Sequence, residues 1–213
     1  GTAYSFSMTF TTNPLPVTIN DIDGNVYQVV TIGAQNWIRS DLKTARLNDG
    51  TAIANVSDDA TWSATTDPAY AWYSNDHLAY PDYGMLYNWA TVNTGLLCPV
   101  GWHVPTEADW MELATTLGGT QYAGGALKET GTIHWLDPNT GATNTTGFTA
   151  LPGGLRAYLG PFAGVGQSGN WWSSSRISVD PTSVTIGTGS ESIMIQMSMD
   201  KFGMSVRCLQ NAK

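Results

Sequence analysis

The sequence predicts an α+β domain with much irregular structure. Three observations support this fold class: helical periodicity after residue 105, alternating apolar residues after residue 183, and a long segment rich in turns and aromatic residues before the helix. A chain of 213 residues can bury a substantial core as one domain, or at most as two small ones.

The N-terminal part is predicted to be a leader followed by a β-hairpin. Residues 1–16 end in two closely spaced prolines, which indicate a linker or an edge strand, so we expect a single domain over 17–213. Alternating apolar residues in Val17–Ile19 and Val26–Ile32 flank the turn Asp21–Asn25. That turn resembles half of a calcium loop, but its glycine is misplaced and it lacks the bidentate glutamate. A hairpin turn is therefore favoured.

The next segments are predicted to form irregular structure and then two helices. Residues 33–95 have weak helical periodicity and many turns and aromatic side chains. Thr106 is placed as the N-cap of the main helix, which Gly118–Gly119 ends. A second short helix is expected over Ala123–Glu129. The main helix carries an apolar stripe of four residues: Trp110, Leu113, Ala114 and Leu117.

The C-terminal third is predicted to consist of antiparallel strands. Apolar residues alternate through Ile193–Met199, Asp200–Gly203 forms a turn, and Met204–Leu209 returns. Val184–Ile186 is expected to be a third strand. Gly164–Gly169 matches the dinucleotide motif G-x-G-x-x-G, but no helix start follows it, so a plain glycine loop is favoured.

The composition argues against binding of nucleic acid and against a membrane span. The formal net charge is −8, and the nine lysines and arginines are scattered, whereas phosphate binding needs clustered cations. No apolar run is long enough to cross a bilayer, and no signal sequence begins the chain, which suggests a mature or trimmed form.

The residues give little support for catalysis. The three histidines form no metal-binding motif, and no G-x-S-x-G motif is present. An enzyme acting on surface polymers would need a carboxylate pair, and no spacing selects one. The carboxylates considered for such a pair are Asp137, Glu129, Glu107 and Asp109.

Two other residue pairs are informative. Cys98 and Cys208 form no C-x-x-C motif, which leaves two free thiols or one long-range bridge. Trp171 and Trp172 are adjacent, so on a strand they point to opposite faces, and we expect at least one ring at the surface. An exposed indole suits stacking on a sugar ring or a protein hot spot, whereas a buried one fills a core.

A series of short motifs follows in a recognisable order along the chain. They are Asp21–Tyr27, Ile32–Trp37, Leu42–Thr44, Tyr83–Trp89, Cys98–Thr106, Leu127–Gly131, Gly141–Asn144, Gly147–Gly154, Trp171–Ser174 and Ser205–Cys208. Together they resemble the Fibrobacter succinogenes major paralogous domain over roughly residues 17–209. The resemblance implies an exported bacterial protein. Such a protein would be secreted, anchored to a lipid through an N-terminus that has been removed here, or held at the outer surface in another way.

Part of this pattern also resembles the C-type lectin-like fold, in the branch shared with formylglycine-generating enzymes. The shared features are the G-W-x-x-P-T-x-x-x-W start of the main helix and the final Ser-Val-Arg. The resemblance implies small antiparallel sheets, two helices and a Cys98–Cys208 bridge. The enzyme branch uses a pair of cysteines near the C-terminus, where only Cys208 stands, so that activity is not expected. Lectin-like domains often bind calcium, but no cluster here can be assigned to it.

These observations lead to the hypothesis of a non-catalytic, adhesin-like domain that binds a glycan or protein ligand, as a monomer and without a cofactor. The segment Arg176–Ser190 departs most from the family pattern. Either selection for different ligands or neutral drift in a surface loop explains this departure. An enzyme, and a fibre subunit using a leader strand at residues 4–12, are the alternatives. The expected ligand-binding residues are Trp171, Trp172, Ser174, Arg176, Ser178 and Asp180.

Overall fold

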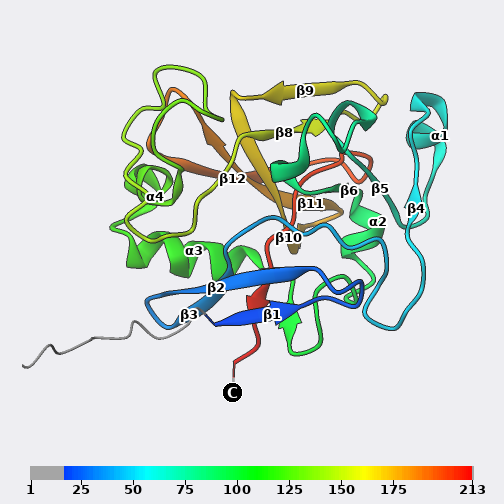
Figure 1. Ribbon diagram of the computed structural model, residues 1–213, viewed down its shortest axis with the longest axis horizontal. Helices are drawn as coiled ribbons and strands as arrows, with labels where there is room; N and C mark the ends of the chain where they lie inside the picture. The colour runs from blue at the N-terminus through cyan, green and yellow to red at the C-terminus, as the bar shows by residue number, and fades with distance from the viewer. Residues whose placement is uncertain (1–16, 213) are drawn as a thin grey trace, which may run out of the picture.

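Two five-stranded sheets form the framework of the protein in the computed structural model, which describes residues 17–212 (Figure 1). A small three-stranded sheet and four α-helices accompany them in this part of the chain. The α+β class is thereby confirmed, with sheets that are mostly antiparallel. The predicted leader 1–16 and its strand 4–12 lie outside the described residues.

The first sheet contains both ends of the described chain. Its order is β1-β2-β3-β13-β7, and all its pairs are antiparallel. The predicted hairpin is confirmed, with Thr18 opposite Gln28. The C-terminal strand pairs Leu209 with both Trp37 and His103. The strands are β1 Thr18–Asn20, β2 Val26–Ile32, β3 Gln35–Ile38, β7 Trp102–His103 and β13 Leu209–Gln210.

The second sheet has the order β12-β11-β10-β8-β9, with only the β10–β8 pair parallel. The strands predicted around residues 184 and 193 are confirmed. The motif Gly164–Gly169 runs from the end of β9 through a tight turn into β10, with no helix after it, so it is a plain glycine loop as predicted. The strands are β8 Gly153–Arg156, β9 Phe162–Val165, β10 Ser168–Ile177, β11 Asp180–Gly187 and β12 Ile193–Met197.

The main helix is confirmed, as α3 Glu107–Thr116. Thr106 and Asp109 form a capping box, in which each side chain accepts a bond from the other residue's backbone. Trp110, Leu113 and Ala114 are buried as the apolar stripe requires. The second helix, α4 Thr120–Leu127, begins and ends slightly before the predicted range.

The aromatic-rich segment contains more regular structure than expected. It includes β4 Ala54–Asn55, β5 Ala69–Ala71, β6 Leu86–Tyr87, α1 Asp59–Ala64 and α2 Trp89–Val92, with single turns at Tyr73–Asn75 and Pro81–Tyr83. The prediction of two helices is therefore wrong for the described residues. Helices of six and four residues are too short to show a periodic pattern, and local caps stabilise them.

The segment Met204–Leu209 does not return beside β12 as predicted. Met204 instead bridges Tyr87, and Ser205 bridges Trp171 in parallel, before the chain enters the first sheet as β13. All residues from Met204 to Cys208 are buried, whereas an edge strand would leave one face in water. The whole segment is therefore part of the core and not an edge strand beside β12.

The prediction of a surface tryptophan in β10 is also wrong, because Trp171 and Trp172 are both 0% exposed. They do point to opposite faces, since each belongs to a different core cluster. The strand β10 lies in the middle of its sheet, so both faces are covered. Each indole N–H is also satisfied internally: Trp171 donates to Asp41 Oδ1 over 2.9 Å, and Trp172 donates to the Tyr87 carbonyl over 2.6 Å.

A buried ion pair links the C-terminal segment to the rest of the core. Arg207 Nε lies 2.6 Å from Asp41 Oδ1, and the two side chains are 1% and 2% exposed. Arg207 also donates to the carbonyls of Phe148 and Thr149, and its guanidinium lies over the Phe148 ring. These contacts satisfy an arginine that burial would otherwise destabilise.

The Cys98–Cys208 disulfide is present, with a Cα–Cα distance of 5.9 Å. Both cysteines are buried, at 2% and 0% exposure. The bridge joins the segment before α3 to the residue before β13 and closes a loop with a sequence separation of 110. The open choice between thiols and a bridge is thereby resolved in favour of the bridge.

Removing the disulfide with Cys98→Ser/Cys208→Ser is expected to lower the free energy of unfolding by about 4 kcal/mol, because the cross-link restricts a long loop in the unfolded chain. Denaturant unfolding measures this change. Iodoacetamide should label neither cysteine in the unfolded, unreduced protein and both after reduction. Labelling of both without reductant would contradict the bridge.

The substitution Asp41→Asn is expected to lower the free energy of unfolding by about 3 kcal/mol, because it leaves the Arg207 charge buried without a counter-ion. Asp67→Asn is the matched control, since Asp67 is exposed, and it should change stability by less than about 0.5 kcal/mol. Equal unfolding midpoints for the two variants would show that the pair is energetically unimportant.

Candidate functional site

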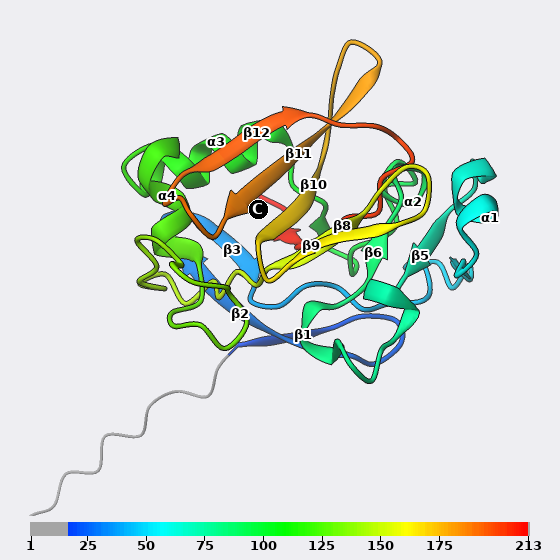
Figure 2. The same cartoon turned by 90° about the horizontal axis from the view of Figure 1, so that it is seen from above.

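The six residues expected to bind a ligand lie along β10 and the start of β11. The structure divides them: Trp171 and Trp172 are buried, whereas Ser174, Arg176, Ser178 and Asp180 are exposed. The exposed residues lie towards the end of the β10–β11 hairpin, which projects beyond the body of the protein (Figure 2). Only the four exposed residues are therefore accessible to a ligand, and their role in binding stays a prediction.

The local backbone explains why the end of the hairpin leaves the core. The β10–β11 register shifts between Trp172 and Arg176, and such irregularities bend a strand and increase its twist. Ser178 has a positive φ of 59° at the hairpin tip, where a tight turn requires it. At the tip, the side chains of Ile177 and Val179 point into solvent and are 46% and 73% exposed.

A polar groove of about 190 Å³ lies beside the base of this hairpin end. Arg176 reaches across it, with Nη2 3.1 Å from Asp200 Oδ1, and its guanidinium lies 4.9 Å from the centre of the Trp89 ring. The groove is lined chiefly by Asn88, Trp89, Asn93, Arg176, Asp200 and Lys201.

Several separate elements hold the walls of this groove in place. Asn88 is the N-cap of α2 and donates to the Asp67 carbonyl over 2.8 Å. The backbone N–H of Trp89 donates to the Asp200 carbonyl over 3.1 Å, which fixes the loop after β12. Lys201 Nζ donates to the Ala64 and Thr65 carbonyls at the end of α1. These residues are far apart in the sequence, so no spacing could have predicted the groove.

The groove can bind a small polar group by hydrogen bonds. It presents two cations, one carboxylate and the exposed Asn93 side-chain amide, and such mixed donors and acceptors suit hydroxyl-rich or zwitterionic ligands. Within residues 17–212, the buried Trp89 Nε1 has no hydrogen-bond partner. Unpaired buried donors are rare in proteins, and a buried water molecule is the usual partner of such a group.

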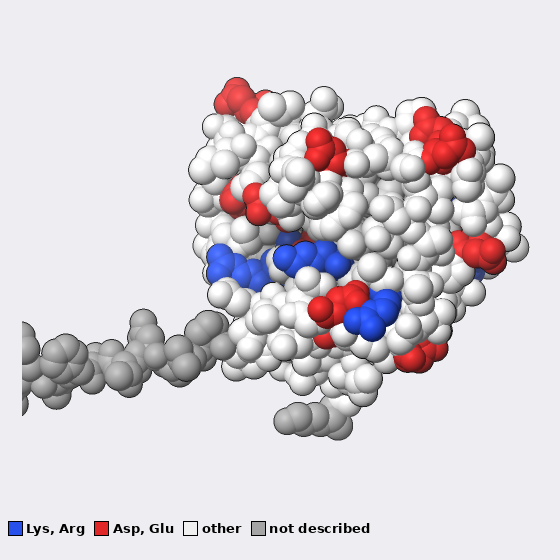
Figure 3. Space-filling view, turned by 45° about the vertical axis from the view of Figure 1, so that its right-hand side comes forward, with Lys and Arg blue, Asp and Glu red and all other residues white. Residues whose placement is uncertain are grey.

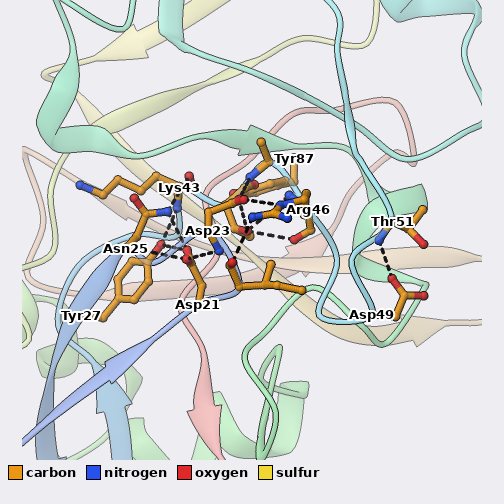
Figure 4. A network of polar contacts seen from close by, with 12 residues as sticks. Asp21, Asp23, Asn25, Tyr27, Lys43, Arg46, Asp49, Thr51 and Tyr87 are labelled. Atoms are coloured by element: carbon orange, nitrogen blue, oxygen red, sulfur yellow. Dashed lines mark hydrogen bonds and ion pairs between the residues drawn. The ribbon is translucent and has the colours of Figure 1, made fainter.

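The turn that resembles a calcium loop is held by the protein's own donors (Figure 4). Asp21 Oδ1 accepts the backbone N–H groups of Asp23 and Asn25, and its Oδ2 accepts from Asn25 Nδ2 and from the Tyr27 hydroxyl. Asp23 pairs with Arg46 over 2.5 Å. The interpretation as a hairpin turn is confirmed, since both carboxylates organise the turn.

The carboxylates considered for an enzyme belong to two regions of the chain, the first turn of α3 and the segment after α4. Asp109 belongs to the capping box and lies 3.2 Å from His103 Nε2. Glu129 contacts His134 Nδ1 over 2.7 Å, while Asp137 is exposed on a loop. Glu107 is in the first turn of α3. Across the described part of the chain, no three His, Cys, Asp or Glu side chains are grouped to hold a metal ion.

The charged side chains are unevenly distributed over the surface. On the face shown in Figure 3, the acidic side chains are scattered, whereas the basic ones gather in a band across the middle. One basic group of that band lies against acidic side chains. Among residues 17–212, no helix has the length and apolar character needed to span a membrane.

Removing the Arg176 side chain with Arg176→Ala is expected to lower the free energy of unfolding by less than about 1 kcal/mol, since its ion pair and ring contact are partly solvated. Arg156→Ala is the contrasting variant, because Arg156 is fully buried and donates to several carbonyls. It should cost about 3 kcal/mol. Thermal and denaturant unfolding measure the stability of both variants. An equal loss of stability in the two would show that the Arg176 side chain is needed for folding.

Comparison with known proteins agrees with the motifs along the chain. The family model described as the Fibrobacter succinogenes major domain matches residues 30–210, which is most of the chain. No curated protein and no solved structure matches it. The match runs from β2 to β13 and includes the disulfide, the buried Asp41–Arg207 pair and the groove. The chain belongs to the Fibrobacter succinogenes major domain family.

Proposed function

We propose that this domain is a non-catalytic ligand-binding module of the bacterial cell surface, which binds a glycan or a protein. The observation that carries the proposal is the exposed end of the β10–β11 hairpin, from which Arg176 covers Trp89 in a polar groove. Exposed loops on a rigid scaffold are where proteins most often place their binding residues.

The hairpin end contributes little to the core, and this supports a role in binding. Ile177 and Val179 expose large apolar side chains to water, and Met197 and Met199 do the same on the neighbouring strand and loop. The register places Met197 opposite Thr182, and Ser198 donates to the Pro181 carbonyl, so both methionines flank the start of β11. Methionine is enriched at protein interfaces, where its flexible side chain adapts to different partners.

We further propose that the fold is C-type lectin-like. Two features support this: the C-terminal strand β13 lies in the same sheet as the N-terminal hairpin, and a disulfide ties the segment before the main helix to the last strand. The disulfide also supports export, because such bridges persist in oxidising compartments. The family resemblance supports a bacterial surface, by a lipid anchor or by secretion.

The two ligand classes would use different parts of this surface. A glycan would place its hydroxyl groups in the groove, among the amides and charges around Trp89. A protein ligand would cover the apolar side chains of Ile177 and Val179 at the hairpin tip. The effects of substitutions in the two places therefore separate the two classes.

The test is a glycan array together with a pull-down from the bacteria that share the protein's environment, using wild type, Arg176→Ala and Ile177→Ser/Val179→Ser. Arg176→Ala should weaken a glycan at least about tenfold, as expected for a charged hydrogen bond, and the double variant should similarly weaken a protein ligand. Ile133→Ser, at an 87% exposed loop position, is the control and should change neither. Absence of any ligand, or equal binding by all variants, would refute the proposal.

A further inference from the structure

A second pocket, which shares no lining residue with the groove, lies beside the first sheet. Its volume is about 320 Å³, near the lower end of the range for small-molecule sites. It lies between strand β2, the segment after β3 and the loop before β8. Its main lining residues are Val26, Gln28, Arg39, Thr149, Leu151 and Arg207.

The pocket carries an excess of positive charge in an otherwise acidic chain. Four of the five arginines have a carboxylate within 4.0 Å, but Arg39 has none among residues 17–212. Asp41 neutralises Arg207, so the charge of Arg39 is uncompensated. Burial lowers the pKa of Arg207, Asp41 opposes this, and the nearby positive charge of Arg39 lowers that pKa further. The two guanidiniums therefore repel each other, and a bound anion would relieve the repulsion.

Arg39 is held in position by neutral acceptors, which leaves some of its donors available. Its Nε donates to Thr149 Oγ1 over 3.2 Å, and its Nη1 donates to Gln28 Oε1 over 3.0 Å. A guanidinium has five N–H donors, so three remain for a ligand. A planar guanidinium with fixed orientation and free donors matches the geometry of a carboxylate.

The backbone at Thr149 adds an independent indication. Thr149 is β-branched and has a φ of +56°, a conformation that costs free energy for such a residue. The Asn144 side chain holds it there, by accepting from its N–H over 2.9 Å and donating to its hydroxyl over 3.0 Å. In this conformation Thr149 contacts both arginines, since its carbonyl accepts from Arg207 over 2.9 Å. Strain that fixes two arginines at a pocket is typical of a binding site.

We propose that this pocket binds the carboxylate of an acidic sugar, a uronic acid residue, with the carboxylate on Arg39. The hydroxyl groups of the sugar would meet the Gln28 side-chain amide N–H₂ and the Ser40 hydroxyl, which also line the pocket. The apolar face of the ring would lie against Val26 and Leu151. The pocket's small size favours one sugar residue over an extended peptide, and this proposal does not rest on the groove beside Trp89.

The test is an NMR titration of the full chain with D-glucuronate and with D-glucose. The two sugars differ only at C6, where glucose has CH₂OH in place of the carboxylate. Glucuronate should shift the amide signals of Val26, Gln28 and Thr149, and glucose should bind at least about tenfold more weakly. Arg39→Gln should weaken glucuronate at least about tenfold, and Arg39→Lys should retain part of the binding, since lysine keeps the charge without the planar fork.

Arg46→Gln is the matched control, because it removes the same charge from an exposed arginine that already pairs with Asp23. It should leave glucuronate binding within about twofold of wild type. Equal binding of glucose, no effect of Arg39→Gln, or tighter binding of an acidic peptide than of glucuronate would overturn the proposal. Signals of Val26 and Thr149 report this pocket, and signals of Asn93 and Arg176 report the groove, so failure of one site is distinguishable from failure of the other.

Discussion

The buried pair of Arg207 and Asp41 is the interaction on which the arrangement of the two sheets depends. Asp41 follows β3 in the first sheet, and it also accepts the indole N–H of Trp171 from β10 in the second. Arg207 lies between Cys208 and the segment that bridges β10, and it binds the carbonyls before β8. One ion pair thus connects both sheets, the loop before β8 and the disulfide.

Such a pair is costly to bury, and apolar residues of similar size are often equally stabilising. Asp41 Oδ2 even lacks a hydrogen-bond partner among the described residues. The contribution of the pair is its directional hydrogen bonds. Because the acceptors of the Arg207 guanidinium are fixed, they allow only one position of the C-terminal segment. We infer that it sets the path of Met204–Cys208 through the core, where apolar side chains alone would permit sliding.

Local patterns in the sequence predicted the local structure, and long-range burial decided what they could not. The capping box at Thr106, the β1–β2 hairpin and the strands around residues 184 and 193 depend on neighbours in the chain, so they could be predicted. Whether Trp171 or Trp172 reaches solvent depends on the position of β10 within its sheet, and the alternation of apolar and polar residues does not show whether a strand is central or at an edge. The groove around Trp89 combines residues from α2, β10 and the loop after β12, and no motif links them.

The distribution of arginine constrains what the two candidate sites can bind. With a net charge of −8, the protein as a whole repels polyanions, and only positions with local positive charge can attract an anionic group. At physiological ionic strength this general repulsion is screened beyond about 8 Å, whereas a direct contact with Arg39 acts over a much shorter distance. A single acidic sugar on Arg39, at the end of a chain or on a side branch, is therefore compatible with the acidic surface. A long, uniformly charged polymer lying across that surface is disfavoured, because the other four arginines already pair with carboxylates and each added residue would increase the repulsion by the acidic protein.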